Sequence, residues 1–302
     1  MEKVNSYSCV SKPLCNYNVQ YSTNAAKLNS SPRFLSNNIG ITSDQFIQTD
    51  KKILYQEQLN KLFPNGGFDV LCKEINKDFN IDNPANVKLV SQYDGVTGGG
   101  YQFYKNEITL NYEDILGSDT KIVGIKNGKR TVLTSPSVKL PLFVDKKSAE
   151  EFLKLHSQNG NLGFDQLVAE PVTENEQRKF ISQKLAHEII HSQQHMILRQ
   201  TEGIGEKEVL KAWSHYKPQN LIDNYILNHF IEKQYSNSYW ANQEPTEQKI
   251  PKESKTAQIA HVWLEAIRNY PPVESPEYLR NPIEMDAYIR SAQYADKKFG
   301  AW

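Results

Sequence analysis

Between residues 43 and 79, apolar residues return every three or four positions. This spacing predicts two helices, at 43–63 and 68–79, separated by FPNGG, whose proline and glycines end helices. The apolar side chains of the first helix lie near helical spacing and are expected to share a face: Phe46, Ile53, Leu54, Leu59 and Leu62.

Between residues 86 and 145 the pattern becomes strand-like. The segments concerned are 86–93, 101–112, 120–134 and 138–145. Two apolar runs in the third segment flank Asn127-Gly128, a strong signal for a hairpin with a type I′ turn. Pro141 predicts that the last segment is an edge strand or lies outside the sheet, because proline cannot donate a backbone hydrogen bond.

From residue 146 onward the spacing is chiefly helical. A long helix is predicted to begin at a capping box formed by Thr173 and Glu176 and to run to about Arg199, with Gly203 and Gly205 ending it. The other predicted helices are 148–157, 206–216, 219–235, 255–269 and 282–298, with a loop at 237–254.

These elements predict the α+β class, with a small mixed or antiparallel sheet packed on the long helix and a mainly helical C-terminal portion. Residues 1–40 show no sustained period and are rich in Ser and Asn, so we expect a flexible polar tail. Residues 41–302 are expected to form one domain, in which 41–200 hold the first helices, the sheet and the long helix, and 201–302 the helical portion.

The charge balance narrows the possible partners. The chain has 35 Lys and Arg against 35 Asp and Glu, so no overall basic field favours nucleic acid. No apolar run is long enough for a membrane span, and the first residues lack the apolar core of a secretory signal.

The three cysteines, Cys9, Cys15 and Cys72, are too few and odd in number for a disulfide framework. We expect a cytoplasmic protein, or one exported without a cleavable signal.

The candidate chemistry lies in KLAHEIIHSQQH, residues 184–195, within the predicted long helix. His187 and His191 are one turn apart on one face, so both imidazoles can reach a single zinc ion. Glu188 is rotated by roughly 100° around the helix axis and can take a proton from a water activated by zinc. The alternative is a helix whose histidines only satisfy hydrogen bonds in the core.

At His187-Glu188-Ile189-Ile190-His191 the chain resembles the zincin metallopeptidases, whose hallmark is this motif. The resemblance implies a sheet packed on the motif helix and a later helical portion that supplies the remaining metal ligand. It also implies an edge strand that holds the substrate as an added strand, for which 101–112 is the candidate. The order of the predicted elements over roughly 85–300 is similar to this plan.

A catalytic zinc site usually has a third protein ligand. Glu284 is our first choice, because RNPIEMDAYIRSAQY resembles the later glutamate helix of the gluzincin branch. Tyr288 lies one turn further on the same face and could donate to a developing oxyanion, and Asp286 could orient a ligand histidine. His195 is disfavoured, because it lies about 12 Å along the axis from His187.

Another interpretation remains open for this ligand. Asn281, Pro282 and Glu284 also form a good helix start, in which the glutamate would only close a capping box. The other candidate ligands are His261 and Glu265, then His215 and His229, and last His156.

The sequence therefore predicts a zinc metalloendopeptidase that acts on a protein or peptide substrate. Such an enzyme could work inside the producing cell, or as an effector or toxin delivered to another cell. The alternative class is a non-catalytic binding or structural protein, in which the motif helix only packs or holds a structural metal.

Overall fold

The computed structural model describes residues 43–91, 99–134, 141–157, 159–215, 217–243, 249–272, 275 and 277–302, with the backbone alone for 43–50 and 242. Residues from Thr42 to Trp302 form one compact unit. The predictions for residues 1–40, for Cys9 and for Cys15 lie outside the described residues.

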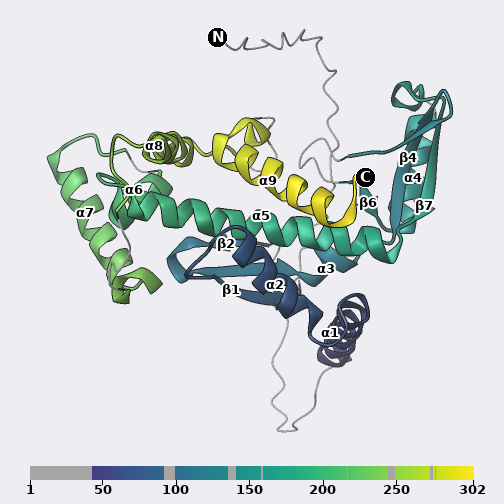
Figure 1. The fold of residues 1–302 in the computed structure, drawn as a ribbon, viewed down its shortest axis with the longest axis horizontal. Helices are drawn as coiled ribbons and strands as arrows, with labels where there is room; N and C mark the ends of the chain where they lie inside the picture. Colours follow the sequence, from purple (N-terminus) through teal and green to yellow (C-terminus); the bar gives the residue numbers. More distant parts are fainter. Residues whose placement is uncertain are drawn as a thin grey trace, which may run out of the picture. The chain divides into compact units, whose positions relative to one another are not determined.

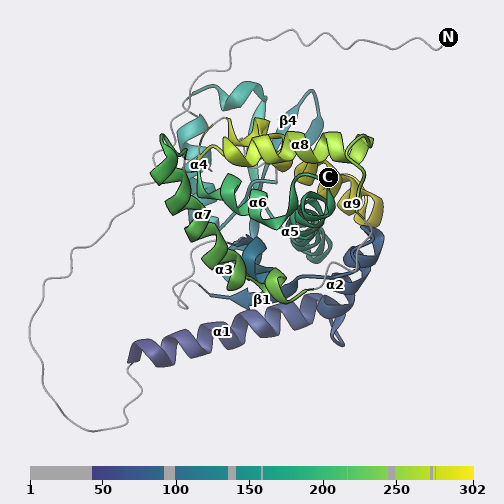
Figure 2. The ribbon, with the colours of Figure 1, turned by 90° about the vertical axis from the view of Figure 1, so that its left-hand side faces the viewer.

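The long motif helix, α5 (Glu174–Gln200), is the axis on which this unit is built (Figures 1 and 2). It begins at the predicted capping box, in which the backbone amide of Glu176 donates to Thr173 Oγ1 (3.3 Å) and the amide of Thr173 donates to Glu176 Oε2 (2.9 Å). Side chains from most of its circumference are buried, because other elements cover several faces of the helix.

One face of α5 carries a three-stranded mixed sheet of β1 (Asn86–Val90), β3 (Glu107–Asn111) and β2 (Gly100–Gln102), in that order. β1 is parallel to the central β3, and β2 is antiparallel to it. Ile108 and Leu110 of β3 pack in one core with Ile181, Leu185 and residues of α2 (Gly67–Asp78). Burial of this apolar surface fixes the sheet against the motif helix.

The predicted strand 101–112 is two strands and part of a short helix. The 3-10 helix η2 (Phe103–Lys105) reverses the chain between β2 and β3, and Asn106 ends it with a left-handed φ of 48°. Asparagine tolerates this conformation better than most residues. The last residue of the segment, Tyr112, begins the short helix α3 (Tyr112–Leu116).

A second, antiparallel sheet lies at the N-terminal end of α5 (Figure 1). Its central strand β4 (Thr120–Lys126) pairs with β5 (Lys129–Val132) and β6 (Phe143–Val144) on one side and with β7 (Gln166–Pro171) on the other. The predicted turn at Asn127-Gly128 is present, with φ values of 51° and 75°. The strand β7 is missing from our prediction, which had no strand after residue 146.

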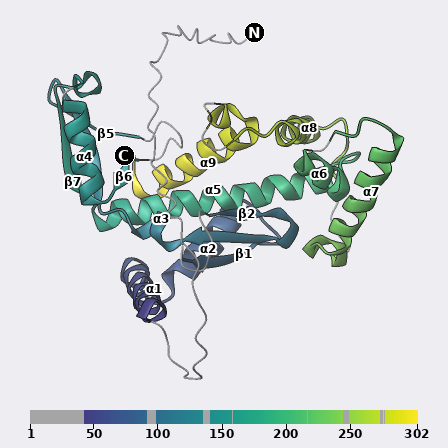
Figure 3. The same cartoon turned by 180° about the vertical axis from the view of Figure 1, so that it is seen from behind.

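Two helices, α8 (Lys255–Arg268) and α9 (Pro282–Phe299), cover the face of α5 opposite the mixed sheet (Figures 2 and 3). The helices α6 (Gly205–Ser214) and α7 (Leu221–Ser236) lie at the C-terminal end of α5, and α4 (Lys146–Ser157) packs against the second sheet. Short 3-10 helices are η3 (Asn161–Gly163), η4 (Tyr239–Asn242) and η5 (Tyr278–Arg280). Leu198 of α5 and residues of α6, α8 and α9 share a second core. The α+β class with a mainly helical C-terminal part is confirmed.

The helix α1 (Ser43–Leu62) differs from prediction in the face that it buries. Leu59 and Leu62 are buried, whereas Ile53 and Leu54 are 51% and 55% exposed. Only the C-terminal end of the helix therefore joins the core, in which Leu59 and Leu62 pack with residues of α2 and α5. The Phe46 side chain lies outside the described residues.

Two further observations concern the predictions for Cys72 and for membrane spans. Burial, with a smaller contribution from Asp69, raises the pKa of the Cys72 thiol to about 12, so this cysteine is held as a thiol beside the core. Among the described residues, no helix combines the length and the apolar composition that crossing a membrane requires.

The cap of α5 gives a test of the fold. Thr173→Ala removes the acceptor for the Glu176 amide and should lower the free energy of unfolding by about 1 kcal/mol in a urea titration. Thr131→Ala, at an exposed position of β5, is the matched control and should change it by less than about 0.5 kcal/mol. Equal effects of the two variants would contradict the assigned start of the helix.

Candidate metal centre

Three side chains from two helices meet beside the middle of α5. His187 and His191 come from α5, and Glu284 comes from the first turn of α9. The two histidine Nε2 atoms are 3.0 Å apart, and they lie 3.3 Å and 3.4 Å from Glu284 Oε2 and Oε1, respectively. Among the described residues, this is the group of three His, Cys, Asp or Glu side chains close enough to hold one metal ion.

The spacing of the three donor groups fits a single small cation. Two bonds of about 2.0–2.1 Å at a tetrahedral angle place their donor atoms roughly 3.3 Å apart. The separations of 3.0–3.4 Å agree with that value. Two imidazole nitrogens and a carboxylate are also a donor set typical of transition-metal sites.

Glu284 is ionised and deeply buried. Only 2% of the residue is exposed. Burial raises the pKa of its carboxyl group, but the positive potential of His191 and the close polar contacts with both histidines outweigh this effect and hold the pKa well below its usual range. The Tyr270 hydroxyl donates to Oε1, whereas Oε2 faces His187 without a hydrogen bond of normal geometry. A buried carboxylate oxygen in this state is suited to a cation.

The other side of the centre is held by a chain of polar contacts. His191 Nδ1 lies 2.8 Å from Gln194 Oε1, and Gln194 Nε2 donates to Asp286 Oδ2 (2.9 Å) and to the carbonyl of Ile283 (2.9 Å). Asp286 therefore does not contact His191 itself but orients it through Gln194. Such outer partners fix the ring orientation of a ligand histidine.

The position of Glu284 follows from how α9 begins. Asn281 caps the helix, because its Oδ1 accepts from the Ile283 amide (3.1 Å) and its Nδ2 donates to the carbonyl of Ala266 (3.1 Å) on α8. The alternative role of Glu284 in a capping box does not fit, since its oxygens face two histidines and Tyr270. The cap ties α9 to α8 and points the first turn of α9 at α5.

Glu188 faces the space in front of the centre. It lines a cavity of about 230 Å³, together with His187, His191 and Glu284. The side chain is half-buried, and within the described part of the chain no protein group forms a hydrogen bond or ion pair with its carboxylate. Its negative charge helps to raise the pKa of His191, which places it within electrostatic reach of the centre.

Three tyrosines surround Glu284, and sequence reasoning found only one of them. The Tyr288 ring packs against the His187 ring, with 4.3 Å between centroids, whereas Tyr270 and Tyr278 line the cavity. Burial, and then the charge of Glu284, raise the pKa of all three phenols, so each is a neutral hydrogen-bond donor. Tyr270 follows α8 and Tyr278 begins the short helix η5, in a stretch where no periodic pattern marks either residue.

His195 does not join the centre, as its distance along the helix predicts. It is 4% exposed and therefore not a surface residue. Its Nδ1 lies 3.1 Å from the Tyr101 hydroxyl, and its Nε2 lies 3.0 Å from Glu206 Oε2. His195 thereby connects the edge strand β2 and the helix α6 to the motif helix.

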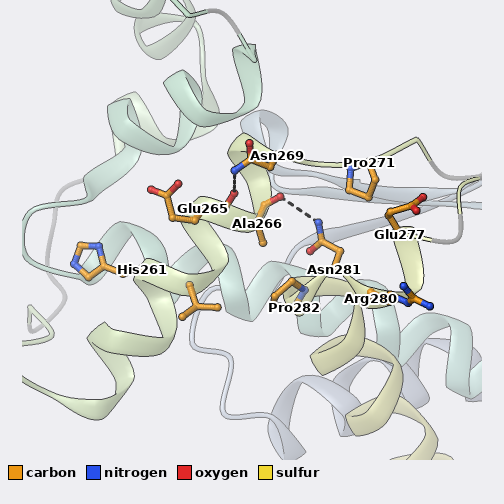
Figure 4. Close-up of a pocket in the computed structure, with 10 residues that line it drawn as sticks. His261, Glu265, Ala266, Asn269, Pro271, Glu277, Arg280, Asn281 and Pro282 are labelled. Atoms are coloured by element: carbon orange, nitrogen blue, oxygen red, sulfur yellow. Dashed lines mark hydrogen bonds between the residues drawn. The ribbon is translucent and has the colours of Figure 1, made fainter. Parts of the chain in front are cut away.

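The alternative third ligands lie elsewhere. His261 and Glu265 line a separate cavity, on the side of α8 shown in Figure 4, together with Asn281 and Pro282. His215 and His229 are exposed, and His156 packs against Phe152 on α4. In the described residues, none of these histidines is brought to His187 and His191.

Fold and site together define an α+β protein with a candidate metal centre built on its longest helix. Comparisons with protein-family models, with curated proteins and with solved structures find no match to this chain.

Loss of the third donor should strongly weaken metal binding at this centre. We expect Glu284→Gln to weaken the binding of Zn²⁺, used as the probe ion, by more than the 10–100-fold that loss of an outer partner typically costs. The measurement is competition with a fluorescent chelator. Glu265→Gln, which changes the rejected candidate, should retain wild-type affinity. The same affinity in both variants would remove Glu284 from the centre.

Metal binding should also release a proton. Burial lowers the pKa of His191, but the charge of Glu284 outweighs it and raises the pKa to about 9 in the metal-free protein. At pH 7.5 the imidazole is therefore protonated and must lose about one proton to bind a cation, so the affinity should rise with pH up to about 9.

Calorimetric titration with Zn²⁺ in two buffers of different ionisation enthalpy counts the released protons. A binding enthalpy that is the same in both buffers would contradict the paired state of His191 and Glu284.

Proposed function

We propose that the protein is a zinc-dependent metallopeptidase in which His187, His191 and Glu284 hold the metal. The observation that carries the proposal is the convergence of these three donors beside a cavity that also exposes Glu188. When bound there, zinc would act as a Lewis acid that polarises a peptide carbonyl and lowers the pKa of water.

Glu188 is the proposed general base and acid. It is the acidic residue of the cavity that is left free when Glu284 binds metal, and no protein group among the described residues pairs with it. From this position its carboxylate can accept a proton from the attacking water and return it to the leaving amine. Its position beside His187 in the helix keeps it at the edge of the metal centre and not within the ligand set.

The neighbouring tyrosines have separate proposed roles. Tyr270 positions the ligand carboxylate, since its hydroxyl donates to Glu284 Oε1. Tyr288 is proposed to donate to the oxyanion that develops on the substrate, from its place against the His187 ring. Tyr278, unlike Tyr288, belongs to the cavity lining and is proposed as an alternative phenol donor to the substrate. All three keep their protons at neutral pH.

The substrate is proposed to bind in extended form along β2. This strand lies at the edge of its sheet, so its outer backbone groups can pair with an added strand. Gly99 and Gly100 line the cavity where β2 begins. A Cβ at Gly99 would lie 2.6 Å from the Thr109 carbonyl oxygen, so only glycine allows this close approach of the two backbones.

Replacement of Glu188 separates the proposed catalysis from metal binding. Glu188→Gln should keep about one zinc ion per chain and lower the rate of peptide hydrolysis by about 10²–10⁴-fold, the usual contribution of a general base. Glu150→Gln, at an exposed position of α4, is the matched control and should retain the wild-type rate.

The measurement is the appearance of new amino termini in a library of random decapeptides, followed by mass spectrometry, with zinc content determined on the same samples. A zinc-loaded wild type that releases no new amino terminus would favour the alternative class, a structural metal in a non-catalytic protein.

A further inference from the structure

The outer face of α7 carries the largest group of exposed apolar side chains in the described part of the chain. Its members, with their exposed fractions, are Leu221 (87%), Tyr225 (74%), Ile222 (71%), Ile226 (57%) and Phe230 (48%). Among the side chains that the structure describes, every other helix or strand presents two such residues at most, as α8 does with Ile259 and Val262. Single exposed apolar residues are ordinary, whereas a contiguous patch of them marks a binding surface.

This patch follows from the way α7 packs. Leu227 and Ile231 are its buried side chains, and they pack with α6 in a small core of their own. Since successive residues turn by about 100° around a helix, Ile222, Tyr225 and Ile226 lie on the side opposite these two. The helix lies at one end of the unit, beyond α6, and its outer side points away from the other described elements (Figures 1 and 3).

The charges on α7 argue against a lipid surface as the occupant of this face. Helices that lie on membranes are rich in Lys and Arg on their polar side. In α7, two acids, Asp223 and Glu232, stand against one lysine, Lys233. Glu232 is also paired with Lys207 of α6 (2.7 Å). An apolar face with so little positive charge is suited instead to the buried centre of a protein–protein interface.

The order of the residues makes this face complementary to itself. In an antiparallel pair of α7 helices with a two-fold axis between Tyr225 and Ile226, each of these residues lies opposite the other one in the second copy. The same register places Leu221 opposite Phe230, and Ile222 opposite His229. Each of the five exposed apolar side chains then meets a residue of the same face. Such reciprocal contacts are what a two-fold dimer requires.

The size of the face agrees with a dimer of moderate affinity. Apolar side chains of these types, exposed to this degree, offer roughly 600 Å² per copy. Two such faces amount to about 1,200 Å², the lower end of the range that specific interfaces bury. Because removal of this apolar area from water stabilises the pair, we expect a dissociation constant in the micromolar range.

We propose that the outer face of α7, defined by Leu221, Ile222, Tyr225, Ile226 and Phe230, is a homodimer interface, occupied by α7 of a second copy of this chain in antiparallel orientation. The inference is independent of the proposed peptidase function, because none of these five residues lines the cavity at the metal centre. Its test is the oligomeric state of the full chain in solution.

Sedimentation equilibrium of the full chain measures this association. Over about 1–300 µM, a range that brackets micromolar dissociation constants, we expect the mean mass to rise from that of one chain toward that of two. A mass of one chain throughout would overturn the interface. Co-sedimentation of that monomer with phosphatidylcholine vesicles would overturn it too, and would assign the face to lipid instead.

Two charged variants test the antiparallel register. When Tyr225→Glu or Ile226→Lys pairs with itself, two charges meet an apolar face, so each variant alone should dimerise at least about tenfold more weakly than wild type. An equimolar mixture of the two variants should recover the dimer. In the mixed pair the introduced carboxylate faces the introduced amine, while the contact related by the axis keeps its native residues. A mixture that associates no better than the separate variants would overturn the proposed pairing.

The matched control is Ile53→Lys on α1, which changes an isoleucine of similar exposure (51%) and should dimerise like wild type. An equal loss of dimer in this control would overturn the assignment to α7. Because the two α7 variants change exposed side chains, both should keep the far-ultraviolet circular dichroism of the wild-type monomer. Recovery in the mixture tests the interface separately from any effect of one substitution on folding.

Discussion

A carboxylate is stable in the interior of a protein only when positive charge and hydrogen bonds replace its lost hydration, which costs several kcal/mol per ion. Glu284 meets this condition by lying between His187 and His191, with the Tyr270 hydroxyl on one oxygen. In the metal-free protein the positive charge is that of a protonated His191, and in the proposed enzyme it would be that of the metal ion. Both states require α9 to meet α5 at this one point.

The surrounding structure follows from that requirement. Asn281 ties the start of α9 to α8, and Gln194 ties it back to the motif helix through Ile283 and Asp286. The mixed sheet packs on a different face of α5, so its edge strand reaches the cavity from the side away from α9. The three candidate metal ligands, Glu188 and the aromatic residues Phe103, Trp213, Tyr270 and Tyr278 therefore line one cavity.

Local signals in the sequence were enough for much of this arrangement. The capping box, the helical spacing around His187 and His191, and the Asn127-Gly128 turn each depend on residues close together in the chain, and each predicted element is present. The strand β7 was missed because it follows a helix in a stretch with no strand pattern, and its pairing with β4 is long-range.

In the candidate site, too, local spacing could be predicted from the sequence and long-range packing could not. The pair of histidines could be read from a spacing of four, but the distance from His191 to Glu284 depends on how three helices pack, which no local pattern encodes. Tyr270, Tyr278 and Trp213 reach the cavity by the same packing, so the sequence alone did not distinguish them from ordinary core aromatics. His195 was correctly excluded as a ligand by helix geometry, but its contacts with Tyr101 and Glu206 were not foreseen.

X-ray absorption at the zinc edge of the purified protein tests the central claim most directly, since it reports the atoms bound to the metal without depending on a substrate. The account predicts one zinc ion per chain, with two imidazole nitrogens and one or more oxygens at about 2.0–2.1 Å and no sulfur. A first shell that contains sulfur, lacks two imidazoles, or is unchanged when Glu284 is replaced by alanine would contradict it.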